Sequence, residues 1–150
     1  MSIDLSPEFI SDVFGPVMQP GSSSHTAGPC RLGYLVGCLL GEESRRIHIL
    51  LDRHSSFAGT FGLMAEDSAM LAGVLGMLPD DPRLYQSRKI VRQAGIEVTF
   101  EFGDLSESRH PNAVKFTLTA ACGKTVSLVG DSTGGGMIET QVVNGFPLRL

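Results

Sequence analysis

An apolar stretch with evenly spaced glycines constrains the fold of this chain more than any other feature. Its apolar residues recur at helical spacing and its glycines lie four residues apart: Leu32, Leu35, Val36, Leu39 and Leu40; Gly33, Gly37 and Gly41. The pattern predicts a helix that packs closely on a neighbour. Pro29 is tolerated only in a first turn, which places the helix start at residues 26–28 and makes Ser23, Ser24 or Thr26 the candidate cap.

The remaining segments predict helices followed by several strands. Alternating apolar residues indicate a strand over 47–51, with His48 pointing away from the core. Helical spacing predicts one helix from Asp67 or Ser68 to about Leu78, and Leu84–Ala94 another that stops at Gly95. Further strands are expected at 96–102, 114–120, 125–129 and 137–143, the middle two joined by a turn at Cys122–Gly123. This order predicts an α+β fold with an α-β-α-β3 core, its helices on one face of a mostly antiparallel mixed sheet.

Composition bounds the function classes. A length of 150 residues, 42% hydrophobic residues and 19% charged residues predict a single globular domain over 1–150. A net charge of −4 without a basic stripe argues against nucleic-acid binding. The longest uncharged runs, 32–41 and 68–79, are too short to span a bilayer, and Met1–Glu8 lacks the pattern of a signal peptide. We therefore expect a cytoplasmic protein without a membrane span.

The three cysteines suggest neither a disulfide framework nor a metal site. Cys30, Cys38 and Cys122 are odd in number and show no C-x-x-C spacing. We expect free thiols, no metal ligands in this chain, and Cys38 in the core. The adjacent acidic pairs, Glu66–Asp67 among them, are expected at solvated ends or caps, with Asp67 as the exception because of the resemblance described below.

The strongest candidate site is the segment Gly21–Thr26. Its three serines, Ser22, Ser23 and Ser24, precede His25 and Thr26 at a predicted helix start, where backbone amides and hydroxyls bind anions or carboxylates. The pattern leaves two interpretations open. The segment is either such a site, or a serine-rich cap with an exposed histidine.

Two later segments carry weaker signals. Pro111 favours an extended His110, which would hold the imidazole over a cleft beside Asn112, although a surface histidine is the simpler interpretation. The run Ser132–Gly136 suits either an anion-binding nest or a bulged strand edge.

Several segments together resemble the β chain of iron–sulfur-dependent L-serine dehydratases. They run in order along nearly the whole chain: Gly15-Pro16-Val17-Met18, Ser22-Ser23-Ser24-His25-Thr26-Ala27-Gly28, Ser56-Phe57-Ala58, Gly73-Val74-Leu75-Gly76, Pro79-Asp80-Asp81, His110-Pro111-Asn112, Gly134-Gly135-Gly136 and Asn144-Gly145-Phe146. The serine-rich segment followed by His-Thr is the most specific of them.

The resemblance implies a function in amino-acid metabolism that feeds gluconeogenesis. The reaction would eliminate water from L-serine and give pyruvate and ammonia, with an open iron acting on the β-hydroxyl while a base removes the α-proton. The [4Fe–4S] cluster would be held by a cluster-bearing α-type partner subunit, since this chain lacks a four-cysteine set. The residues contributed to the shared substrate site would be Ser22, Ser23, Ser24, His25, Thr26, Ser56, Asp67, His110 and Asn112, with His25 the catalytic candidate.

The chain departs from the family pattern at three places. Met64 stands where the family has a histidine in Gly-His-Gly-Thr-Asp, although Asp67 is kept, and a thioether transfers no proton. Gln19-Pro20-Gly21 replaces Ile-Gly-Pro, which changes the expected path of the serine loop. The sequence also ends at Leu150, where many family β chains continue into a regulatory ACT-type domain. We expect no such domain in residues 1–150, and either this sequence stops short of it or this version has none.

Because of these departures, two alternatives to a catalytic dehydratase subunit remain open. Related domains bind effectors in some phosphoglycerate dehydrogenases, so this chain would be a non-catalytic amino-acid or carboxylate effector module, or a degenerate scaffold for a partner. Both homo- and hetero-oligomers remain compatible with the pattern.

Overall fold

The computed structural model describes residues 15–148, so the predictions that rest on Met1–Glu8 and on the chain end at Leu150 lie outside it. A π-helical turn, Ser23–Ala27, continues into α1, and a 3₁₀ turn, Leu84–Gln86, continues into α4. The helices are α1 (Gly28–Leu40), α2 (Ser56–Thr60), α3 (Glu66–Val74) and α4 (Ser87–Gln93). The strands are β1 (Ser44–Asp52), β2 (Glu97–Gly103), β3 (Ala113–Ala120), β4 (Thr125–Gly134), β5 (Met137–Val143) and β6 (Phe146–Pro147).

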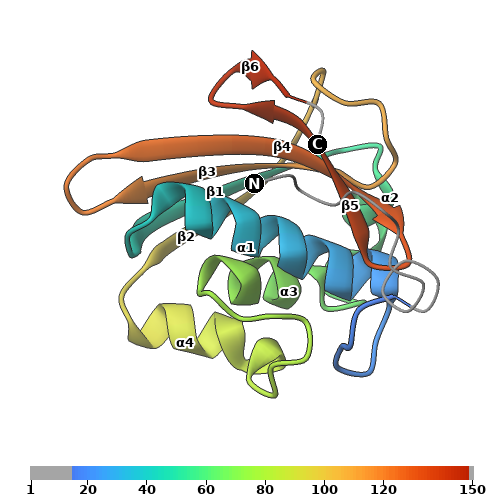
Figure 1. The fold of residues 1–150 in the computed structure, drawn as a ribbon, viewed down its shortest axis with the longest axis horizontal. Helices are drawn as coiled ribbons and strands as arrows, with labels where there is room; N and C mark the ends of the chain where they lie inside the picture. Colours follow the sequence, from blue (N-terminus) through green and yellow to red (C-terminus); the bar gives the residue numbers. More distant parts are fainter. Residues whose placement is uncertain (1–14, 149–150) are drawn as a thin grey trace, which may run out of the picture.

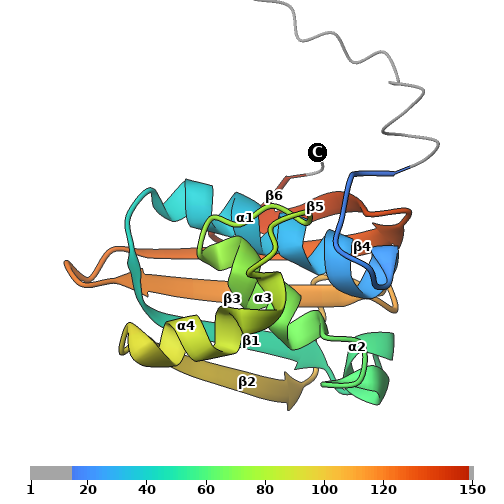
Figure 2. The ribbon, with the colours of Figure 1, turned by 90° about the horizontal axis from the view of Figure 1, so that it is seen from below.

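The strands form one mixed sheet with the helices on a single face. The six strands lie in the order β2-β1-β3-β4-β5-β6. Only the β1–β2 pair is parallel among the described strands, and the other pairs are antiparallel. Helices α1, α3 and α4 cover one face of this sheet, and α2 lies at the same end as the start of α1 (Figures 1 and 2). The predicted fold class is therefore confirmed.

The glycine stripe of α1 faces α3, as the sequence predicts. A Cβ on Gly33 would lie 2.3 Å from the carbonyl oxygen of Met70, and a Cβ on Gly73 would lie 2.0 Å from that of Cys30. Both contacts are with backbone, so the two helices meet with no room for a methyl group between them. Residues such as Leu32, Met70 and Phe116 fill the space between these helices and the sheet.

Some boundaries differ from the predicted ones. Helix α3 ends at Val74 rather than Leu78, because Gly76 has φ +83° and breaks the helix, and Leu78 is 51% exposed. Strand β4 continues past residue 129 to Gly134 because it pairs with β5 along its C-terminal half. Cys38 was expected in the core but lies exposed near the end of α1. Helix α2 was not predicted, since five residues carry too little periodicity.

No helix within residues 15–148 combines the length and the apolar character needed to cross a membrane. The longest, α1, has 13 residues, and its exposed side carries residues such as Tyr34 and Cys38.

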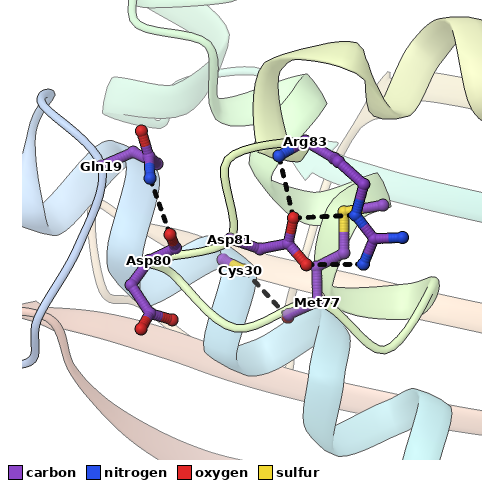
Figure 3. Close-up of polar contacts among 6 residues, drawn as sticks. All are labelled: Gln19, Cys30, Met77, Asp80, Asp81 and Arg83. Carbon is purple, nitrogen blue, oxygen red and sulfur yellow. Dashed lines mark hydrogen bonds and ion pairs between the residues drawn. The ribbon is translucent and has the colours of Figure 1, made fainter.

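The three cysteines are free thiols with different surroundings. Cys30 is fully buried and its Sγ donates to the carbonyl oxygen of Met77 at 3.4 Å (Figure 3). Burial, reinforced by the charges of Asp81 and Asp80, raises the pKa of the Cys30 thiol to about 12.

Cys30 is therefore expected to resist alkylation, because the thiolate is the nucleophile and Cys30 is both buried and protonated at neutral pH. Iodoacetamide should modify the exposed Cys38 and Cys122 in the native chain and all three cysteines in urea, as read by mass spectrometry of peptides. Native-state labelling of Cys30 at the rate of Cys38 would contradict the buried placement.

The segment after α3 is held by an exposed ion pair. The Arg83 guanidinium donates to both carboxylate oxygens of Asp81 at 3.0 and 2.7 Å, and the Arg83 backbone N–H donates at 2.8 Å (Figure 3). These bonds lower the pKa of Asp81 from 3.8 to about 2, with the side-chain bond to Arg83 the main cause.

Because the pKa of Asp81 is lower in the folded chain than in the unfolded chain, its ionised carboxylate stabilises the fold at pH values above 3.8. This contribution is lost as the pH falls through about 2. We expect Asp81→Asn to lower the urea midpoint near neutral pH and the difference from the parent chain to shrink steadily below about pH 4. A difference that stays constant down to the lowest pH at which both chains fold would show that the ionised carboxylate contributes nothing.

Candidate functional site

The serine-rich segment forms the first turn of the helix that continues into α1. Ser22 has extended backbone, and its Oγ accepts the N–H of His25 at 3.2 Å, so Ser22 is the cap rather than Ser23, Ser24 or Thr26. The helical turn thus begins at Ser23, earlier than predicted, and is π-helical up to Ala27. Ser22 takes up the N–H groups of His25 and Thr26, and the hydroxyls of Ser22 and Ser24 lie 3.2 Å apart at the start of the helix.

His25 lies at the centre of a hydrogen-bonded cluster. Its Nδ1 lies 2.9 Å from the Ser24 hydroxyl and its Nε2 lies 2.9 Å from the Ser56 hydroxyl. The ring packs edge-on against Phe57, with centroids 5.3 Å apart. His25 is 9% exposed, so the interpretation as a cap with an exposed histidine is wrong. The structure brings the predicted residues Ser22, Ser24, His25 and Ser56 into one network.

The loop before β3 joins this cluster from the other side. The carbonyl oxygen of Pro111 accepts the N–H of Ser56 at 2.8 Å, and the backbone of Asn112 bonds that of Ser132 at 3.1 Å. His110 and Asn112 are partly buried, and the Asn112 N–H donates to Nδ1 of His110 at 3.1 Å. His110 is thus not the freely exposed histidine of the simpler interpretation.

Asn112 also carries an unusual acceptor. Its Nδ2 donates weakly to the carbonyl oxygen of Ser132 at 3.4 Å, whereas its Oδ1 is buried without a hydrogen-bond partner. Oδ1 is the only such side-chain nitrogen or oxygen in the described part of the chain. A buried acceptor without a donor is costly, so the atom is suited to accept a donor from a ligand.

The side chains of Thr26 and Asp67 bond groups outside the hydrogen-bonded cluster of His25. Thr26 is buried and its hydroxyl donates to the carbonyl oxygen of Met64 at 3.2 Å, so position 64 contacts the site through its backbone. The Met64 side chain is 39% exposed. The Asp67 carboxylate pairs with the Arg88 guanidinium and not with the serine loop. Ser23 is partly buried in the turn itself.

Two residues that organise the site were missed or misjudged. Ser132 donates from its Oγ to the carbonyl oxygen of Ser24 at 2.7 Å, and it lies so close to α1 that a Cβ on Gly28 would meet this Oγ at 2.0 Å. Glu66 was expected at a solvated end but is fully buried. It accepts from the Thr60 hydroxyl and the Met64 N–H, and so holds the loop beneath Thr26. Only the Ser-Thr-Gly run hinted at Ser132, and no local signal marks Glu66.

The segment that enters the serine loop is tied to the loop after α3. The Gln19 backbone N–H donates to the carbonyl oxygen of Pro79 at 2.8 Å, and its Nε2 donates to the Asp80 carbonyl at 2.6 Å (Figure 3). The Tyr85 hydroxyl donates to the carbonyl oxygen of Pro20. The altered Gln19-Pro20-Gly21 sequence is therefore fixed from outside the loop.

The glycine run after Ser132 forms a bulged turn between β4 and β5. Gly134, Gly135 and Gly136 all have positive φ, and the register shifts between Ser132 and Gly134. The Gly136 carbonyl accepts from the Arg31 guanidinium at 2.7 Å. The run thus forms a bulged strand edge, as one of the two interpretations predicts.

Within residues 15–148 no three His, Cys, Asp or Glu side chains gather closely enough to hold a metal ion. The described residues therefore do not fit the ligand set of an iron–sulfur cluster.

Comparison with known proteins supplies the deciding observation. No family model matches the chain. The L-serine dehydratase β chain of Peptoniphilus asaccharolyticus is 34% identical over 139 residues, which is 93% of this chain and 62% of that protein. The probable L-serine dehydratase β chain of Bacillus subtilis (strain 168) is 38% identical over 141 residues, 94% of this chain and 62% of that protein.

The chain is homologous to the L-serine dehydratase β chain. The resemblance is therefore confirmed over 93–94% of the chain. The chain spans about 62% of the length of these relatives.

Proposed function

We propose that this chain is the β-type part of an iron–sulfur-dependent L-serine dehydratase and supplies substrate-binding groups to a site shared with a cluster-bearing α-type chain. The observation that carries the proposal is the homology to named β chains together with the clustering of Ser22, Ser24, His25 and Ser56. The [4Fe–4S] cluster is assigned to the partner, since the described residues of this chain offer no ligand set for it.

The serine loop is suited to the carboxylate of L-serine. The hydroxyls of Ser22 and Ser24 lie together at the start of the helix, and a helix N-terminus favours negative charge. The unpartnered Oδ1 of Asn112 is suited to the substrate's ammonium group, since an ammonium supplies three donors. The two ends of an amino acid thus each have a matching group in this part of the chain.

His25 is the candidate for moving a proton beside the substrate. Its two ring nitrogens contact two different hydroxyls, so a proton lost by one side of the ring can be replaced from the other. Burial against Phe57 keeps the ring in one orientation, which general acid–base chemistry requires.

The proposal is tested by anaerobic purification of the tagged chain from its native cell. We expect a cluster-bearing chain to co-purify and the eluate to be brown from iron–sulfur absorbance. A colourless chain that elutes alone under these conditions would contradict the proposal.

One observation favours a second candidate, an effector-binding module without turnover. The backbone carbonyl of Met64 bonds the Thr26 hydroxyl, whereas the family has a histidine at position 64. The methionine leaves the binding groups of the serine loop intact but removes one side chain that could carry a proton. Isothermal calorimetry separates the two. Saturable binding of L-serine by the chain, in a complex that forms no pyruvate, would favour the effector module.

A further inference from the structure

A buried carboxylate outside the serine loop has no assigned role. Asp131 is 3% exposed and lies near the end of β4. Its neighbours in β4 alternate: a Cβ on Gly130 would meet Leu32 of α1, whereas Val129 packs with Leu105 on the face opposite the helices. Asp131 shares the face of Val129, so it lies on the far side of the sheet from His25.

Neutral donors bond both carboxylate oxygens of Asp131. Oδ1 accepts the Ser108 hydroxyl at 2.8 Å, and Oδ2 accepts the Gln141 side-chain amide at 2.8 Å. Hydrogen bonds to a carboxylate are stronger than those between neutral groups. The Ser108 hydroxyl is therefore held firmly in one direction.

From Ser108 the bonds lead directly into the candidate site. With its proton directed at Asp131, the Ser108 Oγ accepts the backbone N–H of His110 at 3.1 Å. Nδ1 of His110 then accepts the backbone N–H of Asn112 at 3.1 Å. Because Nδ1 accepts, the neutral ring carries its proton on Nε2.

We infer that Asp131 is a positioning residue which, through Ser108, fixes the loop carrying His110 and Asn112, with His110 held as the Nε2–H tautomer. The role of this loop in substrate binding rests on the proposed function, but the bonds that hold it do not. Asp131 acts from the opposite face of the sheet and touches no substrate group.

The first test is hydrogen exchange of the Asn112 amide, observed by NMR. This amide bonds His110 and neither Ser108 nor Asp131, so it reports the loop rather than the deleted contact. We expect Ser108→Ala to speed its exchange roughly three- to tenfold, as the loss of one hydrogen bond predicts. Ser106→Ala is the matched control, because Ser106 lies in the same loop, is exposed, and its hydroxyl bonds Glu107 rather than Asp131 or His110. It should leave the exchange unchanged.

A double-mutant cycle tests whether Asp131 acts through Ser108. Asp131→Ala should speed Asn112 exchange as Ser108→Ala does and add nothing further in the Ser108→Ala chain, whereas Asp131→Asn, which keeps an acceptor, should be nearer the parent. Equal and additive effects of the two alanine changes would overturn the inference. If Asp131→Ala does not fold, Ser108→Ala and Asp131→Asn still test the inference. Unchanged exchange of the Asn112 amide in Ser108→Ala would by itself overturn the inference.

The ring nitrogen shifts of His110 give a second readout that is independent of activity. Among the four histidines, the His110 signal is assigned by its loss in His110→Gln. We expect the Nε2–H pattern in the parent chain and averaging between tautomers in Ser108→Ala. An averaged pattern in the parent would overturn the tautomer assignment. If these results hold while the complex fails to convert L-serine, the proposed function fails and the positioning role stands.

Discussion

Alanine in place of Gly73 is expected to destabilise the fold strongly and to lower its Tm. The added Cβ would lie 2.0 Å from the carbonyl oxygen of Cys30 and 2.6 Å from the backbone N of Tyr34, so α1 and α3 would have to separate. Overpacking against backbone costs about 3 kcal/mol or more. For a domain of this size that corresponds to a fall of roughly 10 °C in Tm.

Gly59→Ala is the matched control. Gly59 lies within α2, where an added Cβ would have no atom within 4 Å, and its φ is not positive. Because alanine favours helix over glycine, its Tm should be unchanged or slightly higher. Thermal unfolding followed by circular dichroism compares the two. Equal Tm values for Gly73→Ala and the parent chain would refute the close α1–α3 contact.

Removal of the His25 imidazole is expected to weaken L-serine binding by about ten- to a hundredfold. His25→Ala deletes both ring contacts and leaves the Ser24 and Ser56 hydroxyls free to turn away. One to two lost hydrogen bonds at a polar site account for an effect of that size. The measurement is the KM for L-serine of the reconstituted complex, or the Kd by calorimetry, together with the urea midpoint.

The urea midpoint separates a binding effect from loss of fold. His54→Ala is the matched control, since His54 is exposed in the turn after β1 and its backbone, not its ring, bonds Asp52. It should change neither affinity nor stability. Unaltered affinity in His25→Ala, with the variant folded, would remove His25 from the site.

The periodic parts of the fold follow from the sequence, because burial repeats at the spacing of each element. The glycine stripe of α1, the hairpin at Cys122–Gly123 and the strand over 137–143 each have a local pattern and appear where expected. Element ends are less predictable. The left-handed Gly76 ends α3 early inside an apolar run, and the pairing with β5 extends β4.

The residues of the candidate site likewise fall into those that a local sequence pattern marks and those that it does not. A contiguous motif marks Ser22–Thr26, and family resemblance adds Ser56 and Asn112, which the structure places beside it. Glu66 and Asp131 act through burial or through contacts with residues that lie far away in sequence, so no local pattern marks them. The glycine run marks the segment of Ser132 but not the bond of its hydroxyl to Ser24. Asp67 was expected at the site, yet its carboxylate pairs with Arg88 on the exposed side of α4.

Formation of pyruvate from L-serine by the reconstituted complex tests the central claim most directly. The chain and its co-purified cluster-bearing partner are mixed anaerobically, and pyruvate and ammonia are measured together. We expect both products in equal amounts from the mixture and neither from this chain alone. A brown, stable complex that forms neither pyruvate from L-serine nor the corresponding 2-oxo acid from any other β-hydroxy amino acid would contradict the assignment as a dehydratase subunit.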